Sequence, residues 1–115
     1  MWLFVIWATV FTGTAVCTLA AFAMFDRLVR LEHARHHEAW IRDGKPIGFF
    51  WIPSDGNFFS GGFARNSLAM SWLFTAPGWV DEESEAKRAL RWMRRLVFTS
   101  WMGWASFLLM FAFPV

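Results

Sequence analysis

The stretch Met1–Phe25, MWLFVIWATVFTGTAVCTLAAFAMF, decides the class of this protein, because it contains no charged side chain. Leu96–Val115, LVFTSWMGWASFLLMFAFPV, is uncharged as well, and all nine acidic and eleven basic residues lie between the two stretches. A helix rises ~1.5 Å per residue, so each stretch is long enough to cross a hydrocarbon core ~30 Å thick. The sequence therefore predicts an all-α membrane protein with transmembrane helices at 1–25 and 96–115.

The first stretch has one alternative explanation, a secretory signal peptide that is cleaved. Such a peptide needs a basic start, a shorter apolar core and a small-residue cleavage site. Here the Met1 amine is the only positive charge before the apolar run, and the run is too long for a signal peptide. The segment Val16–Ala20 nevertheless has a composition compatible with cleavage. We therefore expect the first helix to be retained.

The arginines nearest the two stretches predict the orientation in the membrane. Loops rich in Lys and Arg stay in the cytoplasm, so we expect segment 26–95 to be cytoplasmic and both termini to lie outside. The deciding residues, which we also expect to contact lipid headgroups, are Arg27, Arg30, Arg91, Arg94 and Arg95. The expected fold is an antiparallel two-helix transmembrane hairpin with the lipid bilayer as its partner.

Small residues recur at helical spacing in both stretches and predict where the helices pack. Close backbone approach, which small residues permit, drives helix association in lipid. The residues are Thr9, Gly13, Cys17 and Ala21 in the first stretch, and Thr99, Gly103 and Ser106 in the second. They favour a packed hairpin, although a homodimer could use the same residues and ordinary membrane composition also explains them. Cys17 is the only cysteine, which excludes an intramolecular disulfide.

The first part of the central segment is predicted to be a helix followed by an aromatic loop. Residues 26–43 continue the first helix into the cytoplasm, with Asp26 and Arg30 as an i,i+4 ion pair. Gly44-Lys45-Pro46 then ends the helix. The loop 44–63 is rich in aromatic residues and contains the turn signal Ser54-Asp55-Gly56-Asn57. We expect this loop to lie at the membrane interface, with packing on the cytoplasmic helices or against a partner protein as the alternatives.

The second part of the central segment is predicted to be two more helices. Residues 64–75 form a short interfacial helix that ends at Pro77-Gly78. A last helix begins near residue 82 and runs without a break into the second stretch. Its acidic first turn suits the helix dipole, and Glu83 and Lys87 have the spacing of an i,i+4 pair.

The three histidines form the most chemically suggestive cluster in the sequence: His33, His36 and His37. On a helix, His33 lies on the same face as His36 and His37, so either pair could share a metal ion. Further ligands would come from Glu32, Glu38, another acidic residue or a second subunit. A pH sensor is a second possibility, because histidine titrates near neutrality. The third is a polar surface helix without a ligand.

No other pattern predicts catalysis or a cofactor. Gly44-Lys45-Pro46 lacks the spacing and the Ser or Thr of a phosphate-binding loop. The stretches 1–25 and 96–115 contain no ionisable carboxylate, lysine or histidine, which argues against transport by this chain alone. A net charge of only +2 argues against nucleic acid as a partner. We expect a protein that is not an enzyme and holds no cofactor.

Two motifs and the general layout are similar to a known family. The motifs are Asp55-Gly56-Asn57-Phe58-Phe59, a glycine-aromatic turn, and Arg94-Arg95-Leu96-Val97-Phe98-Thr99-Ser100, in which basic residues enter a span bearing Thr and Ser. With the length, the outward termini and the charged centre, they resemble the universal stress protein B family of small bacterial inner-membrane proteins. This resemblance implies a bacterial inner-membrane location and a link to stress, with no catalytic residues. The histidine cluster and the many tryptophans depart from it.

Together these observations lead to two functional hypotheses. The first is a membrane protein that acts by association, as a homo-oligomer or as an accessory subunit of a membrane complex. The second is a metal- or pH-responsive membrane sensor that uses the histidine cluster.

Overall fold

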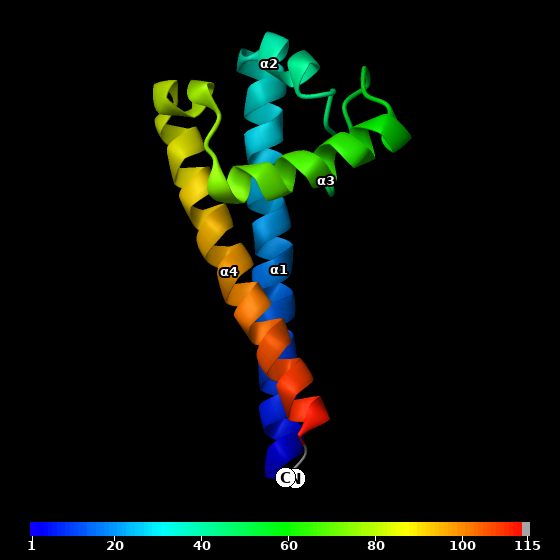
Figure 1. Cartoon of the computed structure of the whole chain (residues 1–115), viewed down its shortest axis with the longest axis vertical. Coiled ribbons are helices and arrows are strands. Elements are labelled where there is room, and N and C mark those ends of the chain that lie inside the picture. Colours follow the sequence, from blue (N-terminus) through cyan, green and yellow to red (C-terminus); the bar gives the residue numbers. More distant parts are fainter. Residues whose placement is uncertain (114–115) are drawn as a thin grey trace.

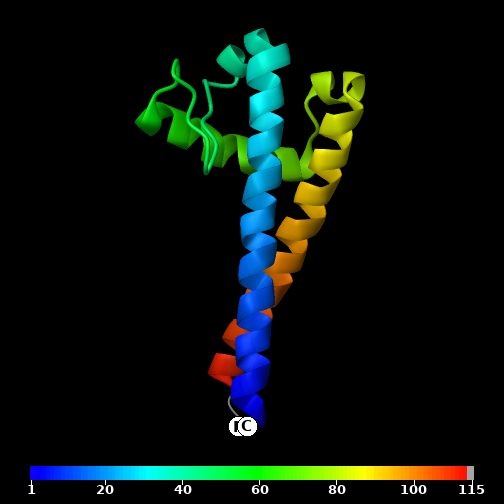
Figure 2. The ribbon, with the colours of Figure 1, turned by 180° about the vertical axis from the view of Figure 1, so that it is seen from behind.

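The computed structural model describes residues 1–113, and every regular element within them is helical. The elements are α1 (Trp2–Arg35), α2 (His37–Arg42), α3 (Phe58–Phe74), the 3-10 helix η1 (Gly78–Glu82) and α4 (Ser84–Ala112). The two long helices α1 and α4 lie side by side and antiparallel, with the start of α1 and the end of α4 at the same end of the molecule (Figure 1). The shorter α3 lies across them (Figure 2). The prediction of an all-helical protein is confirmed for this part of the chain.

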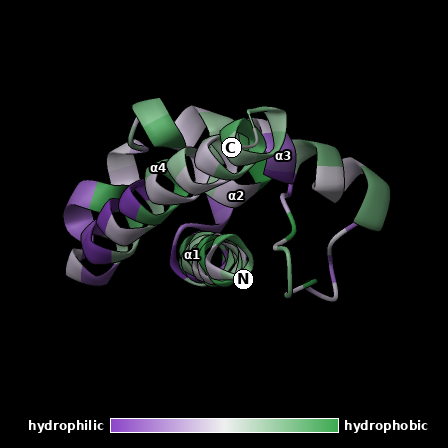
Figure 3. Cartoon of the chain, turned by 90° about the horizontal axis from the view of Figure 1, so that it is seen from below, coloured by the Kyte–Doolittle hydropathy of each residue, from purple (hydrophilic) through white to green (hydrophobic). Residues whose placement is uncertain are grey.

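Helices α1 and α4 are both long and apolar enough to cross a membrane. In each helix, only 6% of the most apolar 18-residue window is buried within the chain, whereas the core helix of a soluble protein is mostly buried. Along α4 the surface changes from hydrophilic near its start to hydrophobic near its end (Figure 3). The apolar halves of both helices are therefore left uncovered by residues 1–113.

Helix α1 extends past the uncharged stretch, as expected, but it ends at Arg35 instead of continuing to residue 43. His36 leaves the helical region at φ −132° and ψ 54°, and α2 begins after it. The imidazole of His36 stacks on Trp79 with ring centroids 4.8 Å apart, and this long-range contact holds the residue at the break. Gly44, at φ +92°, and Lys45, at φ +55°, then take the chain away from α2.

Helix α3 is longer than expected because it begins at Phe58, so residues 58–63 belong to a helix and the assignment of these residues to a loop is wrong. Asn57 is the N-cap, and its side chain accepts hydrogen bonds from the backbone N–H groups of Phe59 and Ser60. A glycine is needed at position 61, inside α3, because the α2–α3 loop approaches the helix closely at Ile47. A Cβ at this position would lie 2.7 Å from Cγ2 of Ile47.

The α2–α3 loop, residues 43–57, is fixed to α1 by Asp26. The carboxylate of this buried residue accepts hydrogen bonds from the backbone N–H groups of Phe49, at 2.6 Å, and Phe50, at 2.7 Å. Gly48 is required beside it, since a Cβ would lie 2.6 Å from the carboxylate. The ion pair expected between Asp26 and Arg30 does not form in the described part of the chain, because the loop occupies the carboxylate instead.

Contacts between α1 and α4 follow positions spaced alternately four and three residues apart. Trp7 packs on Phe107 and Phe111, Phe11 packs on Trp104, and Thr14 lies against Gly103. The same spacing continues through Thr18, Ala21, Phe25 and Leu28, and the last three of these are buried. Alternating steps of four and three keep one face toward a partner over a long helix pair.

Of the small residues singled out in the sequence, Ala21 and Gly103 lie on this contact line and the others lie beside it. Ala21 is buried, Cys17 and Gly103 are half-buried, and the rest are exposed. All except Ala21 border one shallow groove between the helices, namely Thr9, Gly13, Cys17, Thr99, Gly103 and Ser106. Packing of this groove against another helix or another copy stays a prediction.

Candidate metal centre

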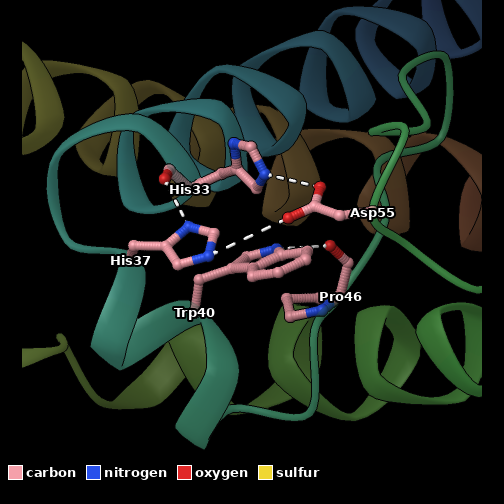
Figure 4. A network of polar contacts seen from close by, with 5 residues as sticks. All are labelled: His33, His37, Trp40, Pro46 and Asp55. Atoms are coloured by element: carbon pink, nitrogen blue, oxygen red, sulfur yellow. Dashed lines mark hydrogen bonds and ion pairs between the residues drawn. The ribbon is translucent and has the colours of Figure 1, made fainter.

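Three side chains that can bind a metal ion come together where α1 ends. His33 comes from the last turn of α1, His37 from the start of α2, and Asp55 from the α2–α3 loop (Figure 4). Each offers one ligand atom, and these atoms lie within 4.8 Å of one another. Helix and loop, far apart in sequence, thus supply one cluster.

The carboxylate of Asp55 faces both imidazole rings. Its Oδ1 lies 2.9 Å from Nε2 of His33, and its Oδ2 lies 3.9 Å from Nε2 of His37. The hydrogen bond with His33 lowers the pKa of Asp55, so this residue is a carboxylate at neutral pH. Metal ions bind the ionised carboxylate and the neutral imidazole, so an ion bound here would replace the hydrogen between Nε2 of His33 and Asp55.

The ring of His37 is held in the tautomer that leaves Nε2 free for a ligand. Its Nδ1 lies 2.9 Å from the backbone carbonyl oxygen of His33, and because a carbonyl only accepts, Nδ1 carries the hydrogen. In the neutral ring the lone pair is then on Nε2, on the side of Asp55. A backbone carbonyl that receives the second ring N–H is typical of metal-binding histidines.

Two tryptophans support the histidine rings. Trp40 is fully buried, and its ring centroid lies 4.6 Å from that of His33 and 5.1 Å from that of His37. Its indole N–H donates to the carbonyl oxygen of Pro46 at 2.9 Å, which fixes the ring (Figure 4). Trp51 packs against His33 from the loop, with ring centroids 5.3 Å apart. The rotamer of His33 is therefore determined by packing.

The cluster is open to solvent on one side, since the side chains of His37 and Asp55 are 46% and 50% exposed and that of His33 is 26% exposed. Three protein ligands leave a coordination position for water or another molecule. Two imidazoles and one carboxylate suit Zn²⁺ and its neighbours among the divalent transition metals. The arrangement fits a metal ion that exchanges with solvent.

Of the three histidines singled out in the sequence, the structure brings two together and places the third elsewhere. His36 stacks on Trp79, and its Nε2 lies 3.4 Å from Oε1 of Glu83. Glu83 also accepts a hydrogen bond from Arg35 at 2.8 Å, so its carboxylate is occupied by the end of α1. The ion pair predicted between Glu83 and Lys87 does not form among the described residues. The third ligand, Asp55, was not singled out, although the turn signal around it was visible.

Glu32, considered as a further ligand, is completely buried about two helical turns beyond the uncharged stretch. Its Oε2 accepts a hydrogen bond from the indole N–H of Trp79 at 3.0 Å. Burial, with the nearby carboxylate of Asp43, raises the pKa of Glu32 to about 9. Glu32 therefore keeps its proton at neutral pH and joins α1 to η1.

The five arginines expected at lipid headgroups have different surroundings. Arg27 lies 3.8 Å from Glu85 of α4, and Arg95 stacks on Trp92. Arg94 donates from Nε to the carbonyl oxygen of Trp72 at 2.9 Å, which satisfies one of the last carbonyl groups of α3. Arg30 and Arg91 are exposed. Contact of any of them with lipid stays a prediction.

Comparisons of this chain with family models, with curated proteins and with solved structures each found no match. The resemblance to the universal stress protein B family therefore stays a prediction.

Proposed function

We propose that this chain is an integral membrane protein in which α1 and α4 cross the bilayer as an antiparallel hairpin. The uncovered apolar halves of both helices support this placement, because water would otherwise face that surface. The charged halves of α1 and α4, with α2, η1 and the α2–α3 loop, form a head on the cytoplasmic side. The arginine distribution supports this orientation, and the resemblance supports a bacterial inner membrane and a link to stress.

The exposed face of α3 supports the same placement. Phe59, Phe63, Met70 and Phe74 lie on one side of this helix, at spacings of four, seven and four, and are 53–79% exposed. Met70 also lines a cavity together with residues of the uncharged part of α1, so this side of α3 faces the apolar halves of the long helices. Large apolar side chains in that position suit a helix lying in the membrane interface.

The head, in this proposal, binds a divalent transition metal and responds to it, with Zn²⁺ as the ion that best fits the ligands. The observation that carries the proposal is the cluster of His33, His37 and Asp55, whose ligand atoms lie within 4.8 Å of one another. A bound ion would tie the α2–α3 loop to α1, because Asp55 belongs to the loop and both histidines belong to the helices. Solvent exposure and an open coordination position favour reversible binding over a permanent structural role.

The direct test is a titration of the purified, detergent-solubilised chain with Zn²⁺ against a competing chelator. We expect one ion per chain, and we expect His37→Gln and Asp55→Asn to weaken binding by about 100-fold, since even outer-shell changes cost 10–100-fold. His36→Gln is the matched control, because His36 faces Trp79 and Glu83 and should leave the affinity unchanged. Absence of Zn²⁺ binding by the natural sequence, or equal loss in the control, would refute the proposal.

A second candidate function is association, as a homo-oligomer or as an accessory subunit of a membrane complex. The shallow groove between α1 and α4 that is bordered by Gly13, Cys17 and Gly103 favours it, since small residues allow another helix to approach closely. Crosslinking in intact membranes tests this function, and a chain that crosslinks to no protein would argue against it.

A further inference from the structure

A cavity of about 390 Å³ lies between α1, α3 and α4, where α3 crosses the long helices (Figure 1). Its volume falls within the ~300–1,000 Å³ of sites that hold small molecules. The lining residues that matter here are Thr18, Phe22, Phe49, Ala69, Ser100 and Trp104. All the lining residues from α1 and α4 except Met93 belong to the uncharged stretches, so in the proposed placement the cavity lies within the membrane, close to the head.

Three polar side chains in the wall of this cavity are already bonded within the chain. Thr18 donates from Oγ1 to the backbone carbonyl oxygen of Thr14 at 2.9 Å and accepts the indole N–H of Trp104 at 3.1 Å. Ser100 donates from Oγ to the carbonyl oxygen of Val97 at 2.8 Å. A water molecule needs two to four polar partners in such a cavity. Apart from Asn66 and the indole N–H of Trp101, the remaining lining is apolar and suits a hydrocarbon occupant.

Arg65 of α3 does not line the cavity itself but packs on Phe49, one of the residues that form its wall. Its guanidinium carbon is 4.6 Å from the centroid of the Phe49 ring, which in turn stacks on Phe22 at 3.9 Å. Arg65 donates from Nε to Asn66 and makes no ion pair within residues 1–113. An unpaired cation therefore stands beside an apolar cavity at the level where the charged residues begin.

We propose that the cavity holds one acyl chain of an anionic phospholipid and that Arg65 binds its phosphate. A phospholipid has the same arrangement as the site, with hydrocarbon inside the membrane and negative charge at its surface. Arginine matches phosphate through its planar set of N–H donors. This inference rests on the proposed membrane placement, which alkaline extraction of intact membranes tests separately.

The experiment is native mass spectrometry of the full chain purified in mild detergent and supplied with phosphatidylglycerol, phosphatidylcholine or palmitate. We expect one retained phosphatidylglycerol, favoured over phosphatidylcholine by about fivefold, the equivalent of ~1 kcal/mol for one cation at the membrane surface. Arg65→Gln should abolish this preference. Equal retention of both phospholipids, displacement of phosphatidylglycerol by an equal amount of palmitate, or a lipid-free dimer would overturn the proposal.

A second variant tests the cavity itself. Ala69→Phe places an aromatic ring in the cavity, and we expect it to lower retention of both phospholipids at least fivefold. Ala105→Phe is the matched control, since Ala105 is exposed on α4 away from the cavity and should change nothing. Unchanged retention in a folded Ala69→Phe variant, checked by circular dichroism, contradicts the proposal. If this variant fails to fold, Arg65→Gln still decides the question, because it fills no space.

Discussion

Replacement of Asp26 by Asn tests whether a single carboxylate holds the α2–α3 loop on α1. In the native chain its two oxygens accept one backbone N–H each, at 2.6 and 2.7 Å. A hydrogen bond to a charged group contributes ~1.5–3 kcal/mol, against ~1 kcal/mol for a neutral one. Asparagine keeps one acceptor and turns a donor toward the other N–H. We therefore expect the loop to lose about 2–3 kcal/mol of docking free energy.

Hydrogen exchange of the amides of Phe49 and Phe50 measures this loss directly, in detergent micelles and with a chelator present. A loss of 2–3 kcal/mol should accelerate their exchange by about 30- to 150-fold, since ~1.4 kcal/mol is a factor of ten. Arg30→Gln is the control, because Arg30 is exposed and its removal should change exchange little. Equal effects of Asp26→Asn and Arg30→Gln on exchange would refute this reasoning and would instead indicate an ion pair between Asp26 and Arg30.

Three further substitutions test the head, the contact between the long helices and the start of α3. Glu32 has a pKa raised to about 9 from 4.5 by burial, so its contribution to stability is complete below about pH 4.5 and is lost as the pH rises toward 9. Glu32→Gln should therefore raise the free energy of unfolding in denaturant by about 3–4 kcal/mol at pH 7, since pH 7 lies about 2.5 units above the pKa of 4.5 in the unfolded chain and each unit is worth ~1.4 kcal/mol, with no gain near pH 4; an equal gain at both pH values contradicts the cause. Gly103→Ala should lower Tm, because its Cβ would overlap Thr14, whereas Gly13→Ala, whose Cβ meets nothing, should raise Tm slightly; a rise in both would show that α1 and α4 are not in contact there. Asn57→Ala should cost about 1 kcal/mol in the same denaturation experiment by removing the N-cap of α3, and no cost would place the start of α3 elsewhere.

The sequence predicts the two long helices because the signal for them is local. Charged residues are excluded from 1–25 and 96–115, and no tertiary contact is needed to see it. The turn before α3 is local as well, since Asp55-Gly56-Asn57 has turn chemistry whatever surrounds it. The turn signal alone does not show that Asn57 caps a helix, because the aromatic residues after it favour a loop.

The acidic residues of the head were assigned wrongly because their partners are distant in sequence. The i,i+4 rule gives each acid a basic neighbour on its own helix, worth only ~0.2–0.5 kcal/mol. Asp26 instead bonds a loop 23 residues away, and Glu83 bonds Arg35, 48 residues away. A charge-assisted bond to a group fixed by the fold is stronger than a solvated pair on one helix. Only the tertiary structure shows that a distant partner competes with the local one. For the same reason, the sequence alone does not predict Asp55 as a metal ligand.

The line of contact between α1 and α4 includes two of the small residues singled out in the sequence, Ala21 and Gly103, but the others lie beside it. Small residues at every fourth position drift around a helix, whereas the observed contacts alternate between four and three. Aromatic residues such as Phe11 and Trp104 occupy much of this line. They pack edge to face and need no close backbone approach. Small size is therefore a weaker guide to packing in this chain than the periodicity of its aromatic residues.

The metal centre and the lipid cavity share the α2–α3 loop, so the two proposed ligands should affect each other. The loop supplies Asp55 to the metal ligands and Phe49 to the wall of the cavity, and Asp26 fixes it between them. A ligand that orders the loop lowers the cost of ordering it for the other ligand.

We therefore expect Zn²⁺ to increase the affinity for phosphatidylglycerol by about fivefold, the lower end of typical coupling energies, and phosphatidylglycerol to increase the affinity for Zn²⁺ by the same factor. Titration of Zn²⁺ into nanodiscs with and without phosphatidylglycerol measures one side, and native mass spectrometry with and without Zn²⁺ measures the other. Phosphatidylcholine is the control lipid in both. Unequal factors in the two directions are thermodynamically impossible for one shared equilibrium, and a factor of one in both would mean that the loop is already fully ordered before either ligand binds.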